Sequence, residues 1–399
     1  MVGATVPRPA PGDGMTQLGR EVAIVGVGYS RLSRGDDPDP RKLTYDASLD
    51  ALADAGLAAT EVDGIYHFFH EVGESPPSAW LQRQLGIPNL NGYLDFSNGP
   101  SGMGPPMVAA MAVAAGICEV ALAYRTLPQR QGNNARVTMS NEVSGPRQFT
   151  DVYGHGAGIL ANYALKKRRR MAELGVSAEE FGLIAINARR WAALNQRALF
   201  RTPITMDEYL SSRVIVDPLL LYDCDYPING SCALLITTAE RAGDLRHKPV
   251  WFDAMAWGTG AGADLNFMDD YLYGGSIDCS RRLWSRSQFS PADVDTAALY
   301  DGFTQLPISW IEALGICGIG EFGSWVRGGE TIGPGGSMPL NTSGGMLAEG
   351  RLQGIGLVAE AVIQLRGEAG DRRQVPDARV AVVAGGGSND CGAYILYRD

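Results

Sequence analysis

The chain has few of the residues that build metal sites and disulfide frameworks. It contains four histidines and six cysteines in 399 residues. The nearest histidine pair, His67 and His70, encloses two phenylalanines, and we interpret it as the end of a strand rather than a metal site. The cysteines are scattered without metal-ligand spacing, which indicates free thiols in a reducing compartment, so we expect a cytoplasmic protein without a metal.

Long apolar runs and an excess of positive charge are also missing. No apolar stretch reaches the ~20 residues that span a bilayer, so we expect no membrane span. The formal net charge of −10 excludes the general basic footprint of proteins that bind nucleic acids or anionic membranes. Residues 1–20 are rich in Pro and Gly and lack the apolar core of a signal peptide, so we expect a flexible extension.

What is present is the composition and pattern of an α/β protein. Hydrophobic residues make up 45% and charged residues 20%, as in ordinary globular chains. Short apolar runs typical of buried strands alternate with helical segments. The first run, Val22–Gly28, ends in Gly-x-Gly, but it lacks the third glycine and the immediate helix of a dinucleotide-binding fingerprint. We therefore exclude that class of site.

Two turns of similar sequence, Asn98–Met103 and Asn341–Met346, precede a helix and a strand in each half of the chain. The repeat predicts a duplicated α/β fold in which two helix starts face one site. We place the first half at residues 21–245 and the second at 246–399. Strand signals fade over residues 125–228, which we interpret as a helical insertion over one face of the sheet.

The first turn has the features of an oxyanion-binding loop without a nucleophile. Gly99 lets a ligand approach the backbone, and Ser101 is placed to cap the helix that follows. The start of a helix carries N–H groups and the positive end of the helix dipole. The turn contains no cysteine, so any reaction there proceeds without a thiolate from this loop.

These features in this order resemble the thiolase superfamily, in particular its sterol-carrier or lipid-transfer-protein branch, over about residues 20–399. The resemblance implies a five-layer αβαβα fold of duplicated βαβαβ halves with a helical loop insertion. The segments that carry it are Val22–Gly28, Asn98–Met103, Tyr163–Leu165, Asp225–Ala233, Tyr300–Thr304, Asn341–Met346 and Ala384–Gly387.

The departures from the family pattern concern its catalytic residues. Working thiolases carry a nucleophilic Cys where Gly99 stands, a His where Arg351 stands and a second Cys where Ala384 stands. The lipid-transfer branch has His-Asp-Cys-Phe where this chain has Tyr300-Asp-Gly-Phe303. Since thiolysis and Claisen condensation need a thiolate to carry the acyl group, the residues for that chemistry are missing.

A retro-aldol cleavage of a bulky β-hydroxyacyl-CoA fits what is left, because it needs an enolate site and acid–base groups but no nucleophile. We expect Tyr300 to be the acid or base, with His155 near the substrate and Asp301 as an orienting group. The predicted oxyanion and substrate-binding residues are Gly99, Ser101, Asn341, Gly345 and Gly386.

The branch also contains the actinobacterial steroid side-chain-cleaving aldolases, which resemble thiolases and lack the Cys/His set. The resemblance implies cleavage of a 17-hydroxysteroid carboxyl-CoA to a 17-ketosteroid and propionyl-CoA. It further implies a homodimer joined to a DUF35 partner with zinc-ribbon and OB-fold domains, giving a heterotetramer, and no cofactor besides the coenzyme A of the substrate.

The basic run Lys166–Arg170 reads as the solvated face of a surface helix. Because the helical insertion of thiolase-like folds binds CoA phosphates, we expect CoA contacts from four arginines in this region. They are Arg168, Arg169, Arg189 and Arg190.

Two other functions stay open at this point. One is a non-catalytic thiolase-like subunit that binds acyl-CoA within a larger complex. The other is a thiolase with a relocated cysteine, for which Cys118 and Cys391 are the nearest candidates, although both read as packed thiols.

Overall fold

The fold is organised around a mixed sheet that has nine strands within the described part of the chain. The computed structural model describes residues 21–36, 38–69, 75–97, 99–128, 148, 159–260, 270–386 and 390–399. Across the sheet the order is β3-β2-β4-β7-β1-β8-β11-β10-β9. The strands are β1 (Val22–Tyr29), β2 (Gly64–Phe68), β3 (Gly92–Phe96), β4 (Val120–Leu127), β7 (Gly230–Thr238), β8 (Val250–Gly258), β9 (Thr296–Leu299), β10 (Val380–Gly385) and β11 (Cys391–Tyr397).

The two halves of this sheet repeat one pairing pattern, as the similar turns predict. In the first half β3, β2 and β4 pair in parallel, and β4, β7 and β1 pair antiparallel. In the second half β9 and β10 pair in parallel, and β10, β11 and β8 pair antiparallel. A parallel bridge between Ala297 and Leu340 stands where the first half has its β2–β3 pair. Strands β1 and β8 join the halves.

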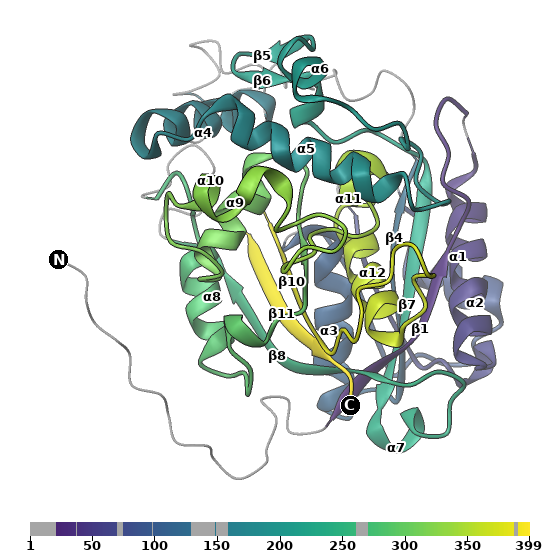
Figure 1. Ribbon diagram of the computed structural model, residues 1–399. Coiled ribbons are helices and arrows are strands. Elements are labelled where there is room, and N and C mark those ends of the chain that lie inside the picture. The colour runs from purple at the N-terminus through teal and green to yellow at the C-terminus, as the bar shows by residue number, and fades with distance from the viewer. Residues whose placement is uncertain are drawn as a thin grey trace.

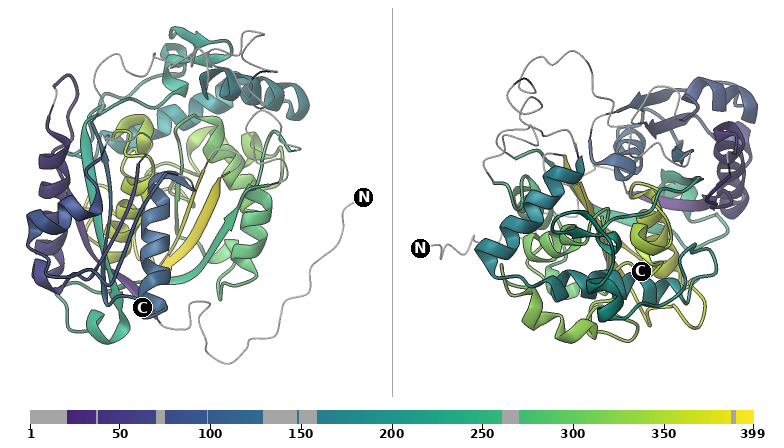
Figure 2. Two further views of the ribbon diagram at one scale, coloured as in Figure 1. Left: turned by 180° about the vertical axis from the view of Figure 1, so that it is seen from behind. Right: turned by 90° about the horizontal axis from the view of Figure 1, so that it is seen from above.

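Helices lie outside each half and between the halves, which gives the five layers expected from the sequence (Figures 1 and 2). The outer layers are α1 and α2 on the first half and α8 and α9 on the second, and the central layer holds α3 and α12. Their bounds are α1 (Pro40–Ala55), α2 (Ser78–Leu85), α3 (Gly104–Ala114), α8 (Ser276–Trp284), α9 (Gln305–Ala313) and α12 (Ile355–Arg366). Shorter helices are α7 (Ala239–Ala242), α10 (Phe322–Trp325) and α11 (Gly345–Ala348).

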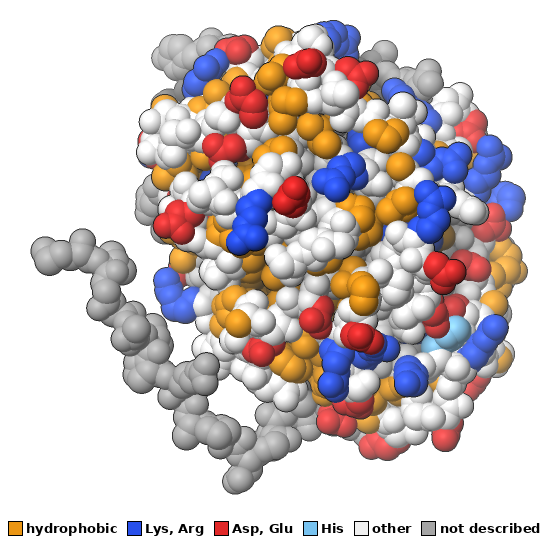
Figure 3. All heavy atoms as spheres, in the orientation of Figure 1, with side chains coloured by type: hydrophobic (Ala, Val, Ile, Leu, Met, Phe, Trp, Pro, Cys, Tyr) orange, Lys and Arg blue, Asp and Glu red, His pale blue; other side chains and the backbone are white. Residues whose placement is uncertain are grey.

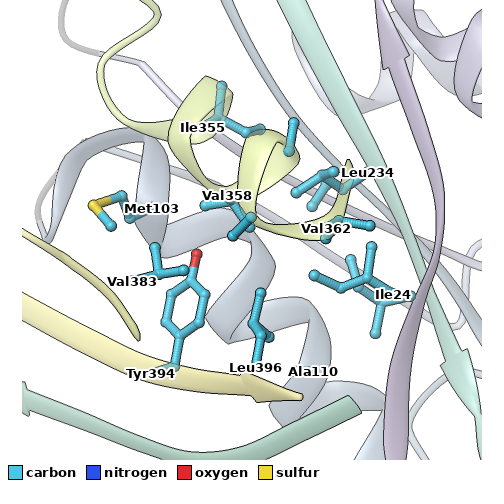
Figure 4. Packing of buried hydrophobic residues seen from close by; sticks show 14 of the residues in the cluster. Ile24, Met103, Ala110, Leu234, Ile355, Val358, Val362, Val383, Tyr394 and Leu396 are labelled. Carbon is cyan, nitrogen blue, oxygen red and sulfur yellow. The ribbon is translucent and has the colours of Figure 1, made fainter. Parts of the chain in front are cut away.

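The central helix α12 is apolar almost all round because it has a half-sheet on both sides. In the core between the halves, Val362 of α12 lies toward Ile24 and Leu234 on one side of the helix (Figure 4). The other side is formed by strands β10 and β11. Burying this helix on two faces fixes the position of its N-terminal end, which lies beside the candidate site.

The helical insertion lies over one end of the layers (Figures 1 and 2). It contains α4 (Ile159–Leu174), α5 (Ala178–Ala192), α6 (Met206–Leu210) and the hairpin of β5 (Val214–Val216) and β6 (Leu219–Leu220). Residues 125–127 belong to β4 and not to the insertion, which corrects its predicted start. The polar residues Arg125 and Thr126 hid this strand end in the sequence, yet both are buried.

One face of the molecule can be compared with the charge pattern of the sequence. On the face shown in Figure 3, basic and acidic side chains are interspersed rather than gathered into a field of one sign. Within the described residues, no helix is both long and apolar enough to cross a membrane.

Candidate active site

Tyr300 lies where β9 ends and the turn into α9 begins. Its N–H donates to the carbonyl of Ala384 at 2.8 Å, which ties it to the end of β10. Burial raises the pKa of the phenol to about 12, and the charge of Arg351 opposes that rise. The Ser101 side chain hydrogen-bonds to the same phenol. At neutral pH Tyr300 is therefore protonated and is suited to donate a proton.

A carboxylate that the sequence did not single out, Asp225, is the neighbour of Tyr300. The Asp225 N–H donates to the carbonyl of Gly302 at 3.1 Å. A Cβ built on Gly302 would lie 2.9 Å from Tyr300 Cε1 and 3.5 Å from Asp225 Oδ2. A side chain at position 302 would therefore press on the Tyr300 ring and lie close to the Asp225 carboxylate, and glycine avoids this contact.

Arg351, which stands where thiolases have a histidine, pairs with this carboxylate. Its Nε lies 3.4 Å from Asp225 Oδ2. Burial raises the pKa of Asp225 to about 6, and the charge of Arg351 acts against the rise. Asp225 is thus ionised at neutral pH. The only sequence signal for it was its place in the Asp225–Ala233 segment, because its partner is far away in the chain.

Asp301 holds the second turn in place. Its carboxylate accepts hydrogen bonds from the N–H groups of Met346 at 2.9 Å and Leu347 at 3.5 Å, at the start of α11. Gly345 is required there, because a Cβ on it would lie 2.0 Å from Asp301 Oδ2. Burial raises the pKa of Asp301 to about 7 against these hydrogen bonds and one from Asn341. The structure shows Asp301 fixing the start of α11, and its role as an orienting group in catalysis stays a prediction.

The N–H groups of the first turn are already bonded. The Gly99 N–H hydrogen-bonds to the carboxylate of Asp390, whose pKa burial raises. The N–H of Ser101 points to the carbonyl of Gly99 at 2.6 Å, and that of Gly102 to the carbonyl of Gln353 at 2.8 Å. The Gly99 donor expected for an oxyanion is therefore occupied in this structure, because distant segments fold back onto the turn.

Of the other predicted residues, Asn341 and Gly386 contribute to the backbone structure around the site, and His155 is not among the described residues. The Asn341 amide accepts from the Leu299 N–H and donates to the Leu299 carbonyl, both at 2.8 Å, so it fastens the end of β9. Gly386 follows β10 with a φ of 99°, a conformation that favours glycine. His155 and Asn98 lie outside the described residues.

The four arginines predicted to bind CoA have protein partners in the structure. Arg168 and Arg169 are exposed on α4 and pair with nearby surface carboxylates. Arg189 of α5 is buried, and its guanidinium stacks among aromatic rings. Arg190 donates to the carbonyl of Gly329 at 3.3 Å.

The basic run on α4 is not the solvated face that the sequence suggested. Lys166, Lys167 and Arg170 are buried. Lys167 pairs with Asp223 at 2.5 Å, and Arg170 pairs with Glu312 at 2.7 Å. The Arg170–Glu312 pair joins the insertion to α9, whereas the Lys167–Asp223 pair lies within the insertion. Part of the run therefore points inward, and Arg168 and Arg169 point outward.

The cysteines do not have the properties of a catalytic thiolate. All six are free, and four of them are buried. Burial raises the pKa of Cys118 to about 11 and that of Cys391 to about 12, so both are protonated at neutral pH. Among the described residues, no group of three or more His, Cys, Asp or Glu side chains is arranged to hold a metal ion.

Comparisons with known proteins identify relatives over most of the chain. Residues 262–396 match the family model "Thiolase C-terminal domain-like". The 17-hydroxy-3-oxo-4-pregnene-20-carboxyl-CoA lyase of Mycobacterium tuberculosis is 36% identical over 88% of this chain and 92% of its own length. The steroid side-chain-cleaving aldolase of Thermomonospora curvata is 34% identical over the same shares. Among solved structures, an Ltp2-ChsH2(DUF35) aldolase superposes with a TM-score of 0.85 at 31% identity, covering 95% of this chain and 98% of that one.

Proposed function

This chain belongs to the thiolase superfamily, in the branch that contains the steroid side-chain-cleaving aldolases, and we propose that it cleaves a bulky β-hydroxyacyl-CoA by a retro-aldol reaction. It is a carbon–carbon lyase. The substrate is a 17-hydroxysteroid carboxyl-CoA, and the products are a 17-ketosteroid and propionyl-CoA. This assignment is supported by relatives that are 34–36% identical over most of the chain.

One structural observation carries the proposal. The Tyr300 ring and the Asp225 carboxylate both lie next to Gly302, where a Cβ would be 2.9 Å from Tyr300 Cε1 and 3.5 Å from Asp225 Oδ2. A retro-aldol reaction needs proton transfers but no covalent carrier, and this pair supplies a donor and an acceptor. Burial keeps the thiols of Cys118 and Cys391 protonated, which fits a reaction without a thiolate.

The reaction proceeds through a thioester enolate. Loss of the β-hydroxyl proton forms the ketone, the Cα–Cβ bond breaks, and its electron pair enters the thioester as an enolate. The charge of Arg351 favours a negative charge close to Tyr300. For the Gly99 N–H to receive the enolate oxygen, the thioester has to displace the Asp390 carboxylate that now accepts this hydrogen bond. Protonation of Cα then releases propionyl-CoA.

The proposal also covers the oligomeric state, the partner protein and the cellular location. The name of the superposed aldolase includes a DUF35 protein, which supports a DUF35 partner for this chain. We assign the chain to a homodimer that binds two such partners and works in the cytoplasm. The reaction uses no cofactor besides the coenzyme A carried by the substrate, and the four arginines of α4 and α5 remain our candidates for contacts to it.

A cleavage assay tests this function. The chain, alone and with a DUF35 partner, is incubated with a 17-hydroxysteroid carboxyl-CoA, and ketosteroid and propionyl-CoA are followed by chromatography. We expect Tyr300→Phe to lower kcat by about 10²–10⁴-fold, the usual worth of a general acid or base. Binding of the CoA ester without turnover under any of these conditions would instead support the non-catalytic subunit.

A further inference from the structure

The retro-aldol reaction needs a base at the β-hydroxyl and an acid at Cα, and four ionisable groups lie near one another at the end of β9. They are Tyr300, Asp301, Asp225 and Arg351, and the charges of the last three all act on the Tyr300 phenol. The proton acceptor has to be an ionised group with an oxygen open to a ligand. Of the four groups, one has contacts that meet this condition.

Two of the groups do not qualify as the base. Arg351 carries a guanidinium, which stays charged and has no acceptor atom. Asp301 is buried, and both of its oxygens accept backbone N–H groups at the start of α11. Moving Asp301 toward a substrate would leave these buried donors unpaired, at a cost of about 1–3 kcal/mol each.

Tyr300 fits the opposite role. Its phenol stays protonated until the pH is well above neutral, because burial disfavours the phenolate. Once the phenol has given up its proton, the Ser101 hydrogen bond and the Arg351 charge both stabilise the phenolate. These are the properties of a proton donor to a strongly basic enolate carbon.

Asp225 is the group that is both ionised at neutral pH and partly accessible to a ligand. Its side chain is 12% exposed, and among the described residues the Arg351 guanidinium is the group paired with its carboxylate. The charged and titratable groups around it are Arg351 from the loop before α12, Tyr300 and Asp301 from the end of β9, and the neighbouring Cys224.

We propose, on the basis of the function given above, that Asp225 is the base that removes the β-hydroxyl proton and that Tyr300 is the acid that protonates Cα. The Asp225 carboxylate takes the hydroxyl proton, and the oxygen's electron pair forms the carbonyl as the Cα–Cβ bond breaks. The bonding pair becomes the thioester enolate, and its Cα takes the proton of the Tyr300 phenol. Transfer of the proton on Asp225 to the Tyr300 phenolate then restores both groups, so no proton is gained or lost overall.

Chemical rescue distinguishes a base from a structural residue. We expect Asp225→Ala to lower the rate of cleavage by about 10²–10⁴-fold. Sodium formate, titrated against sodium chloride at constant ionic strength, is expected to restore part of the rate, because a small carboxylate fits the vacated space and accepts the proton. Tyr300→Phe is expected to gain nothing from formate. Asp46→Asn, which changes an exposed carboxylate of α1, is the matched control and is expected to keep the wild-type rate.

Each result has a definite meaning. Wild-type protein that releases no ketone contradicts the proposed function itself. If the wild type cleaves and a folded Asp225→Ala variant keeps its rate within about threefold, or loses it without response to formate, Asp225 is not the base. If the variant does not fold, the wild-type pH profile decides the matter: kcat/KM has to fall below about pH 6, and a flat profile between pH 5 and 8 overturns the assignment.

Discussion

Replacing Arg351 by Gln is expected to shift the pH-dependence of kcat/KM. The acid limb, where kcat/KM falls as the pH is lowered, moves to higher pH. The limb of kcat/KM reports the free enzyme's base, which is Asp225 with a pKa of about 6 in the native protein. The guanidinium lies 3.4 Å from the carboxylate and lowers this pKa. Removing a positive charge disfavours the carboxylate, so the pKa rises and the variant loses activity at a higher pH than the wild type does.

The size of the displacement follows from the separation of the charges. At 3.4 Å the Coulomb energy of the two charges is about 1 kcal/mol at the dielectric constant of water, ~80, and about 5 kcal/mol at ~20, which is typical of pairs near a protein surface. Since one pKa unit corresponds to about 1.36 kcal/mol, even the weaker interaction moves the limb up by about one pH unit, and the burial of the carboxylate favours a larger displacement. The alkaline side is unaffected near neutrality, because the pKa of Tyr300 is already about 12 and rises further without the charge.

The assay is the initial rate of ketone release from pH 4.5 to 9 at low substrate concentration. Arg351→Lys retains a charge and is expected to keep its limb near that of the wild type. Arg281→Gln, which removes an exposed arginine of α8, is the control. A limb in Arg351→Gln at or below the wild-type pH would refute the electrostatic reasoning, because it would show that the Arg351 charge does not act on the base.

Other changes test the remaining features. Gly302→Ala places a methyl group 2.9 Å from Tyr300 Cε1, which displaces the ring, and we expect cleavage to fall by about 10²-fold by steady-state assay while circular dichroism stays unchanged. Lys167→Met removes the cation that pairs with the buried Asp223, whose carboxylate keeps its hydrogen bonds from Tyr209 and Thr304, and is expected to cost about 3–5 kcal/mol in urea denaturation, against about 0–1 for Lys42→Met in an exposed pair. With propionyl-CoA, mass spectrometry is expected to show no acyl adduct on Cys391 or any other thiol, and such an adduct would favour a relocated thiolase cysteine.

Much of the fold could be predicted because its signals are local. Apolar runs mark the strands, and the two similar turns indicate the duplication that the pairing order repeats. The end of β4 escaped prediction because Arg125 is polar, although its guanidinium is buried and donates to Gln353 Oε1 at 2.8 Å. When a buried charged residue has its partner in a distant loop, the residues next to it in the sequence do not indicate that it is buried.

The candidate site was harder to predict than the fold, because its residues interact across long separations in the chain. Tyr300 could be proposed from the sequence because it replaces a family residue at a strand end. Asp225 becomes a candidate only through its pairing with Arg351, which is more than a hundred residues away. The Gly99 N–H is taken by Asp390 for a similar reason. Local sequence indicated which backbone groups start a helix, but only the folded chain determines which of them are already bonded.

The hydrogen bond from Gly102 to Gln353 also has a consequence for the order of folding. It joins the first turn to the loop that carries Arg351, and closing so long a segment of chain is slow compared with forming local helices and hairpins. During synthesis the first half emerges without the residues that complete its turn. We therefore expect the catalytic pocket to mature last, so a refolding experiment should recover helical signal before substrate binding.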